Sequence, residues 1–142
     1  LLGEPVRIGG PVRSKTFPNQ GFLTVANDGT LLYLEGDAGA SDTELVWVDR
    51  QGHLLEELGV VGDLYSLDIS HDGRRVAFDN SEPETGGDIW VYDFGRRSSI
   101  RLTDHKLDES VPRWSNEDDV IYFFRGADLM MVDLSGAPPS SS

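Results

Sequence analysis

The stretch LDISHDGRRVAF at residues 67–78 has the form of strand, tight turn and strand, and DIWVYD at residues 88–93 adds another strand. An Asp-Gly pair between two apolar runs indicates a hairpin, because it supplies the positive φ that such a turn needs. The turn recurs. Asp72 follows Asp28 of an earlier Asn-Asp-Gly turn by 44 residues, and Glu117 of a later, altered turn follows Asp72 by 45. A fixed period of this size predicts a repeat architecture.

The inner strands of the repeat are apolar along their whole length and do not alternate with polar residues. Ile89–Tyr92 and Val120–Phe124 are examples. Such runs indicate that both faces of a sheet are buried. That is the situation in a β-propeller, where each four-stranded blade packs between two neighbours. We therefore predict an all-β fold of β-propeller blades, each of four antiparallel strands, with three blades per chain.

Residues 1–142 are expected to form a single propeller unit whose segments follow the period, with residues 10–20 as a connector. Its parts are a displaced outer strand at 4–9, blade 1 at 21–59, blade 2 at 64–103, blade 3 at 109–136 without an outer strand of its own, and a disordered-looking tail at 137–142.

The missing outer strand bears on assembly. Pro5–Gly9 shares with Ser99–Thr103 the pattern apolar, Arg, apolar, small residue, so the N-terminal strand is predicted to complete a blade that lacks one. Propellers have roughly four to eight blades, and three blades would leave sheet edges and apolar faces uncovered. In one interpretation two copies form a homodimeric six-bladed ring, in which the N-terminal strand of each completes the last blade of the other. In the other, the chain is a fragment of a longer propeller.

The charge of the chain restricts its partners. It carries 12 basic and 25 acidic residues, a net charge of −13, and no Cys. Nucleic-acid binding needs a basic stripe, which is missing, and anionic membrane surfaces are disfavoured for the same reason. The lack of Cys excludes disulfides, thiolate metal sites and a Cys nucleophile. Basic peptides and metal cations are the better electrostatic match.

Several stretches resemble TolB-like, WD-repeat-like propeller blades, namely residues 69–78, 88–93, 101–103 and 112–115. Leu45–Gly52 is similar to the first blade of the propeller regions attached to bacterial serine/threonine kinases. The resemblance implies a six-bladed propeller used in protein–protein contacts, often outside the cytoplasm, and thus an extracytoplasmic (periplasmic) location. Asn116–Asp119 departs from the family's Pro-Asp-Gly turn, and we expect a looser hairpin there.

No catalytic constellation is recognisable. The chain has no Gly-x-Ser-x-Gly elbow, no phosphate-binding glycine loop and no kinase motif, and His53, His71 and His105 fall in three separate predicted loops. We expect no enzymatic activity, no cofactor and no metal site. A metal-dependent propeller hydrolase is an alternative, but it would need several carboxylate and amide ligands on inner strands, which offer Asp68 and little else.

Residues that recur at equivalent positions are predicted to be structural. The aspartates would cap turns through side-chain-to-backbone hydrogen bonds, and the tryptophans would form the core between blades. They are Asp49, Asp93 and Asp133 after the third strands, Asp28 and Asp72 in the first turns, and Trp47, Trp90 and Trp114.

Positions that differ between blades are better candidates for ligand binding than the residues that recur. Thr24, Asp68 and Arg113 occupy equivalent positions near the predicted channel. The loops on one face of the ring are acidic, and their binding candidates are Asp63, Asp104, Asp108 and Glu109. The turns on the other face are mixed and contain Arg50, Arg74, Arg75, Arg96 and Arg97. Acidic loops around the opening of a ring concentrate a negative electrostatic potential there, which favours a protein or basic-peptide partner.

Overall fold

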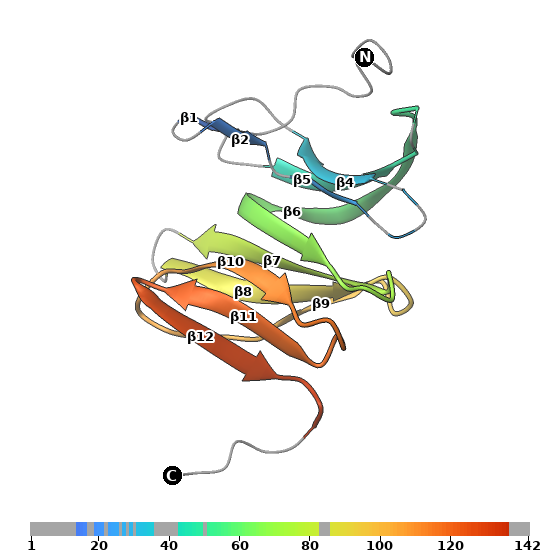
Figure 1. Cartoon of the computed structure of the whole chain (residues 1–142). Coiled ribbons are helices and arrows are strands. Elements are labelled where there is room, and N and C mark those ends of the chain that lie inside the picture. The colour runs from blue at the N-terminus through green and yellow to red at the C-terminus, as the bar shows by residue number, and fades with distance from the viewer. Residues whose placement is uncertain are drawn as a thin grey trace, which may run out of the picture.

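A computed structural model describes residues 14–16, 19–21, 23–25, 27, 29, 31–35, 43–49, 51–82 and 86–136. Every regular element in this part of the chain is a β-strand, and all the pairings are antiparallel (Figure 1). The all-β prediction is therefore confirmed there. The displaced strand predicted at 4–9, the tail at 137–142, Asp28 and Arg50 lie outside the described residues.

Seven strands form one sheet in chain order. They are β3 (Leu23–Val25), β4 (Leu31–Glu35), β5 (Thr43–Val48), β6 (Leu54–Ile69), β7 (Arg75–Glu82), β8 (Gly86–Asp93) and β9 (Ser98–Arg101). A three-stranded sheet follows, in the order β10 (Glu109–Trp114), β11 (Val120–Arg125) and β12 (Asp128–Asp133). Residues predicted as a connector include a small hairpin, β1 (Ser14–Thr16) with β2 (Asn19–Gly21).

The long strand β6 belongs to two layers. Its residues 54–62 pair with β5, whereas residues 63–69 pair with β7, so β6 carries the chain from the upper sheet of Figure 1 into the one below it. The boundary predicted between residues 59 and 64 thus falls inside a continuous strand. Two glycines accommodate the bend: Gly59 has a φ of 67°, and a Cβ on Gly62 would lie 2.6 Å from Asn80 Oδ1. We call β3, β4, β5 and residues 54–62 the first sheet, residues 63–69 with β7, β8 and β9 the middle sheet, and β10–β12 the third sheet.

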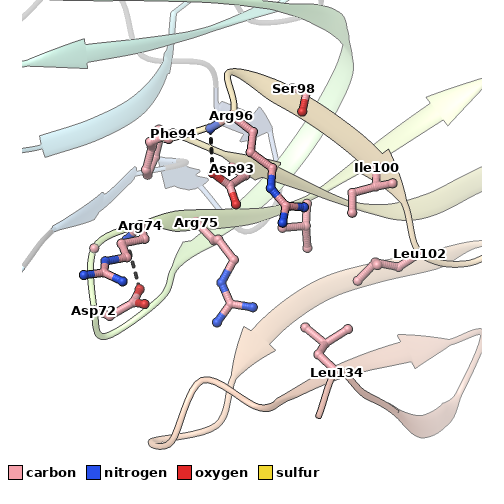
Figure 2. A pocket seen from close by; sticks show the side chains of 13 residues that line it. Asp72, Arg74, Arg75, Asp93, Phe94, Arg96, Ser98, Ile100, Leu102 and Leu134 are labelled. Atoms are coloured by element: carbon pink, nitrogen blue, oxygen red, sulfur yellow. Dashed lines mark hydrogen bonds between the residues drawn. The ribbon is translucent and has the colours of Figure 1, made fainter. Parts of the chain in front are cut away.

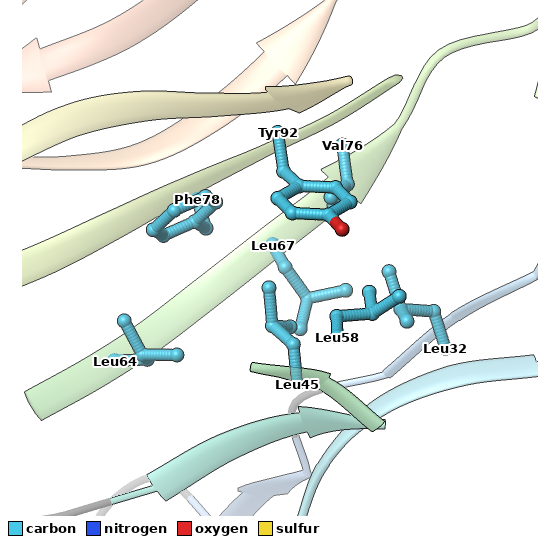
Figure 3. Packing of buried hydrophobic residues seen from close by; sticks show 8 residues of the cluster. All are labelled: Leu32, Leu45, Leu58, Leu64, Leu67, Val76, Phe78 and Tyr92. Carbon is cyan, nitrogen blue, oxygen red and sulfur yellow. The ribbon is translucent and has the colours of Figure 1, made fainter. Parts of the chain in front are cut away.

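The first and middle sheets pack on each other through an apolar cluster (Figure 3). Leucines of the first sheet meet Val76, Phe78 and Tyr92 of the middle sheet, and Trp47 and Trp90 pack against the same cluster. Its eight buried members are Leu32, Leu45, Leu58, Leu64, Leu67, Val76, Phe78 and Tyr92.

The middle and third sheets share a second apolar cluster, of Ala77, Ile89, Val91, Trp114, Ile121 and Phe123. Neighbouring residues of β8 therefore face different layers: Tyr92 points to the first sheet and Val91 to the third. Since side chains alternate across a strand, a strand buried on both faces must be apolar throughout. This explains the unbroken apolar run at 89–92.

Within the described residues, the third sheet is covered on one face only. Ile121 and Phe123 are buried in the second cluster, whereas Tyr122 and Phe124 between them are each 43% exposed. On β12, Leu129 is 69% and Met131 61% exposed. No described strand pairs with the outer edge of β12. We call Tyr122, Phe124, Leu129 and Met131 the open face.

In the described part of the chain no helix is long and apolar enough to span a bilayer.

Candidate binding surfaces

Two of the three channel-side candidates lie at one pocket. Thr24 and Asp68 are both half-buried and line a cavity of about 330 Å³, together with His71, Trp114 and other residues. Arg113 is exposed and does not line this cavity. Its Nη1 donates a hydrogen bond of 2.8 Å to the Pro112 carbonyl.

Asp68 also ties two sheets together. Its Oδ2 accepts a hydrogen bond from the Trp114 N–H at 2.8 Å, and the Trp114 indole Nε1–H donates to the Asp68 carbonyl at 3.0 Å. Burial raises the pKa of Asp68, opposed by the Trp114 N–H and the positive charge of Arg113. An aspartate whose oxygen is already held by a backbone donor is a weak ligand on its own, so this pocket offers one partly engaged carboxylate.

The four acidic-face candidates are not gathered in one place, and neither described pocket is lined by them. Asp104 is exposed beside Arg101, and Asp63 accepts a hydrogen bond of 2.8 Å from the Tyr65 hydroxyl. Asp108 accepts the Gly87 N–H at 3.1 Å. Glu109 is buried and does not reach the surface: its carboxylate pairs with Arg125 inside the third sheet.

The recurring aspartates bind backbone donors in their turns. Asp49 Oδ1 accepts the N–H groups of Gln51 and His53 at 2.8 and 2.9 Å. Asp93 and Asp133 each accept an N–H at 2.8 Å, from Arg96 and Ser135. Asp72 accepts the Arg74 N–H at 2.9 Å. Carboxylate acceptors of this kind stabilise tight turns.

The tryptophans lie between layers. Trp47 of the first sheet contacts Phe94 at the end of the middle sheet, with ring centroids 5.1 Å apart. Trp114 is buried in the second cluster, and the Arg75 guanidinium carbon lies 4.5 Å from its ring centroid. Such a cation–π contact adds to the packing between the middle and third sheets.

Sequence reasoning missed the buried Asp79. It lies on β7, directly after the apolar run 76–78, and its carboxylate accepts hydrogen bonds from β6 and β10. An aspartate inside an apolar strand is a recognisable signal. Its partners Tyr65, Ser66 and Val111, however, are distant in the chain and could not be identified from spacing.

Asp118 was also missed, and the prediction of a loose third turn is wrong. The turn closes as the second one does: the Asp118 N–H donates to Ser115 O at 3.1 Å, as the Gly73 N–H does to Ser70 O at 2.9 Å. Asp118 occupies the equivalent of Gly73, with φ of 57° against 69°. Aspartate tolerates this left-handed region better than most residues.

The Asp118 carboxylate also connects two turns. It accepts the N–H groups of His71 and Asp72 at 2.7 and 2.8 Å. Asn27 makes a similar link from the first turn, where its Nδ2 donates to the His71 carbonyl at 2.6 Å. Three turns one repeat apart are thus joined in a row.

Replacing Asp118 by glycine is expected to lower the free energy of unfolding by about 1 kcal/mol. Glycine removes the cost of a positive φ, but the two N–H groups lose their charged acceptor, and this loss is the larger effect. Urea unfolding measures the change. Glu117→Ala, at the exposed neighbouring residue, should stay within about 0.5 kcal/mol of wild type. A gain in stability for Asp118→Gly would show that strain dominates.

A larger pocket lies beside the β6–β7 and β8–β9 turns of the middle sheet (Figure 2). It has a volume of about 890 Å³ and is bounded by the turns at 72–75 and 93–96, by β9 and by Leu134. Its charged residues are Asp72, Arg74, Arg75, Asp93 and Arg96, and its apolar lining includes Val91, Phe94, Ile100, Leu102 and Leu134. We call it the arginine pocket.

Among the described residues, no three His, Asp or Glu side chains are grouped so that they could hold a metal ion.

Antiparallel sheets stacked face to face, with their strands in chain order, define the class of this protein as a β-propeller-type fold. The chain is similar to the solved structure of a putative TolB from Agrobacterium tumefaciens, with a TM-score of 0.71 and 16% identity over 88% of this chain and 47% of that one. It is also similar to TolB from Acinetobacter baumannii, with a TM-score of 0.66 and 19% identity over 81% of this chain and 30% of that one.

A third similar structure is the β-propeller domain of the trilobed protease from Pyrococcus furiosus, which has an open velcro topology. Its TM-score is 0.56, at 16% identity over 80% of this chain and 39% of that one. No protein-family model and no curated protein sequence matches the chain. The comparisons support a TolB-like β-propeller fold, and the chain spans less than half the length of each of these three structures.

Proposed function

We propose that the chain is a non-catalytic propeller module for protein–protein interaction, and that its third sheet is where it assembles. The observation that carries this proposal is the open face, where four large apolar side chains lie exposed next to an edge of β12 with which no described strand pairs. Soluble proteins rarely leave such contiguous apolar surface uncovered without an interaction to serve. An unpaired strand edge is in addition a template for a further strand.

The occupant that we propose is a second copy of the chain. Two copies would close a six-bladed ring, with the apolar open face against the partner's propeller sheet and residues 4–9 of the partner along β12. The similarity of residues 5–9 to 99–103 supports this arrangement, because residues 98–101 form β9, the outer strand that pairs with β8. Asp128 corresponds to Asp88 when Asp133 is aligned with Asp93, and Asp88 binds Arg101 at 2.5 Å. Arg7, which aligns with Arg101, would therefore meet Asp128.

The wild-type chain is expected to be a dimer at micromolar concentration by size-exclusion chromatography with light scattering. Met131→Glu should yield a folded monomer, because it places a charge on a surface that the dimer buries. Leu107→Glu changes an equally exposed apolar residue, 55% against 61%, that lies in a loop outside the open face. It should leave the dimer intact. A monomeric wild type, or dimers for both variants, would rule out the second copy as the occupant.

A second candidate is a segment of a longer TolB-like sensor propeller of a kinase or peptidase. The short span of the chain relative to the similar structures favours it. In that case further blades of the same polypeptide would cover the open face. A longer polypeptide, extended along the native gene, would then be monomeric, and Met131→Glu would destabilise it without changing its oligomeric state.

The acidic loops and the pocket at Thr24 and Asp68 belong to the same proposal as contacts for a protein or basic peptide. Asp104 and Asp108 are exposed. An extracytoplasmic location, implied by the resemblance to TolB-like propellers, completes the proposal.

A further inference from the structure

We infer that the arginine pocket is a binding site for an extended peptide segment in which carboxylate and apolar side chains alternate. This goes beyond the proposed assembly. The pocket lies against β9 and two turns of the middle sheet, apart from the open face on β11 and β12.

The cations of the pocket come from two different turns. Figure 2 shows Arg75 and Arg96 extending toward the space bounded by Ile100, Leu102 and Leu134. No described carboxylate forms an ion pair with Arg96, in contrast to its neighbour Arg97, which pairs with Glu56. Arg75 is held by the Asp118 carbonyl, at 2.8 Å from Nη2, and by the Trp114 ring. A guanidinium anchored in this way is pre-organised to bind a carboxylate with its remaining donors.

The two aspartates of the pocket do not neutralise these cations completely. Asp72 Oδ1 accepts a hydrogen bond from the Arg74 N–H at 2.9 Å, and Asp93 Oδ1 accepts one from the Arg96 N–H at 2.8 Å. Each carboxylate thus fixes the backbone that presents an arginine. Three arginines against two aspartates leave a local excess of positive charge in a chain of net charge −13. The remaining acidic residues are screened beyond about 8 Å at physiological salt.

The other wall of the pocket is apolar and accessible. Ile100 is exposed and Leu102 and Leu134 are half-buried. An extended peptide projects alternate side chains to opposite sides, so alternating carboxylates and leucines would meet the arginines and the apolar wall at once. The cavity volume of about 890 Å³ is within the range of roughly 300–1,000 Å³ that is typical of ligand sites.

The test is fluorescence anisotropy with a short, capped, fluorescein-labelled peptide of alternating leucine and glutamate. We expect saturable binding that weakens as salt is raised. Arg96→Gln should raise the Kd about tenfold, the effect of losing one charge-assisted hydrogen bond. Arg97→Gln removes the same charge from the same turn outside the pocket, and should change the Kd by less than about twofold. Ile100→Ser should also weaken binding.

Peptides in which glutamine or lysine replaces glutamate are the matched ligands. Equal binding of the glutamine peptide would show apolar adhesion only, and equal effects of Arg96→Gln and Arg97→Gln would show non-specific charge attraction. Either result, or no binding by the wild type, overturns the inference. Measurement on the Met131→Glu variant separates this result from assembly, because the pocket should still bind peptide when the dimer is lost.

Discussion

Replacing Asp79 by alanine is expected to lower the free energy of unfolding by about 3–5 kcal/mol, because several backbone donors lose their acceptor and each buried donor left unsatisfied costs about 1–3 kcal/mol. Oδ1 accepts the N–H groups of Tyr65 and Ser66 at 3.0 and 2.6 Å, and Oδ2 accepts the Val111 N–H at 3.1 Å. The register of β6 shifts between Leu64 and Leu67, which takes two of these donors out of the strand ladder. Without the carboxylate they would be buried and unpaired.

Val111 adds to the effect. It lies where the register of β10 shifts, and its φ of 57° is unusual for a β-branched residue. The hydrogen bond to Asp79 helps to hold this conformation and joins the middle sheet to the third. Chemical unfolding of Asp79→Ala should therefore show a large shift in midpoint. Asp104→Ala is the control, because Asp104 is 83% exposed, and it should change stability by less than about 0.5 kcal/mol. Similar results for the two variants would contradict a structural role for Asp79.

The same substitution should have a distinctive pH dependence. Burial raises the pKa of Asp79, although the hydrogen bonds from Ser66, Val111 and Tyr65 oppose the shift. A group with a raised pKa in the folded state binds its proton more tightly there than in the unfolded state. The resulting stabilisation is complete below the unfolded-state pKa, near 3.9, and is lost as the pH rises through the folded-state pKa. The loss caused by Asp79→Ala should therefore be larger at acid than at neutral pH.

Asp133 provides the opposite case. Hydrogen bonds from the Ser135 hydroxyl and N–H lower the pKa of Asp133. The contribution of Asp133 to stability is therefore present above the unfolded-state pKa and is lost as the pH falls through the folded-state pKa. Asp133→Ala should cost stability at neutral pH and little in acid. Unfolding curves for both variants between acid and neutral pH would test the pair. Parallel curves would mean that neither shift has the stated direction.

Replacing Arg125 by alanine should also cost about 3–5 kcal/mol, because it leaves a buried carboxylate without its cation. Glu109 and Arg125 face each other on β10 and β11, and the Glu109 side chain is 0% exposed. Arg125 Nε donates a hydrogen bond to Glu109 Oε1 at 2.7 Å, and Nη2 lies 2.6 Å from the same oxygen. Thermal and urea unfolding measure the loss.

A double substitution separates this pair from its surroundings. Changing both Glu109 and Arg125 to leucine removes the buried charges together and should restore most of the stability, since apolar replacements of a buried pair are often neutral or better. Arg97→Ala breaks a more exposed pair with Glu56 and should cost less than about 1 kcal/mol. If Arg125→Ala is as mild as Arg97→Ala, the pair on β10 and β11 is not effectively buried.

The all-β, antiparallel architecture was predictable because its signals are local. The Asp-Gly turn at 72–73 and the unbroken apolar run at 89–92 follow from turn conformation and from burial on two faces, and both are read within a few residues. The change of pairing partner falls between residues 62 and 63, inside the predicted interval of 59–64. The continuity of β6 across it was not predictable, because a bent strand and two strands joined by a loop have similar local sequence patterns. The close approach of Gly62 to the side chain of Asn80, which lies on another strand, is likewise absent from any local pattern.

The candidate sites were less predictable, because they depend on which strands become neighbours. Glu109 was expected on an acidic face, but the antiparallel partner Arg125 draws it into the third sheet. Asp79 and Asp118 received no role in advance, although each binds donors more than ten residues away in the chain. The arginine pocket brings together two turns, β9 and Leu134, and no spacing rule relates these segments.

Local sequence is enough to specify antiparallel strands in a repeat of about 45 residues, because turn chemistry and apolar patterning act over short distances. Packing in three dimensions selects which charges are buried as structural pairs and which remain free to bind. Desolvation and hydrogen bonding depend on neighbours brought close by packing, as the contrast between Glu109 and Arg96 shows. Glu109 is enclosed between two strands together with its cation, Arg125. Arg96 points into the arginine pocket from a turn whose backbone is hydrogen-bonded to Asp93.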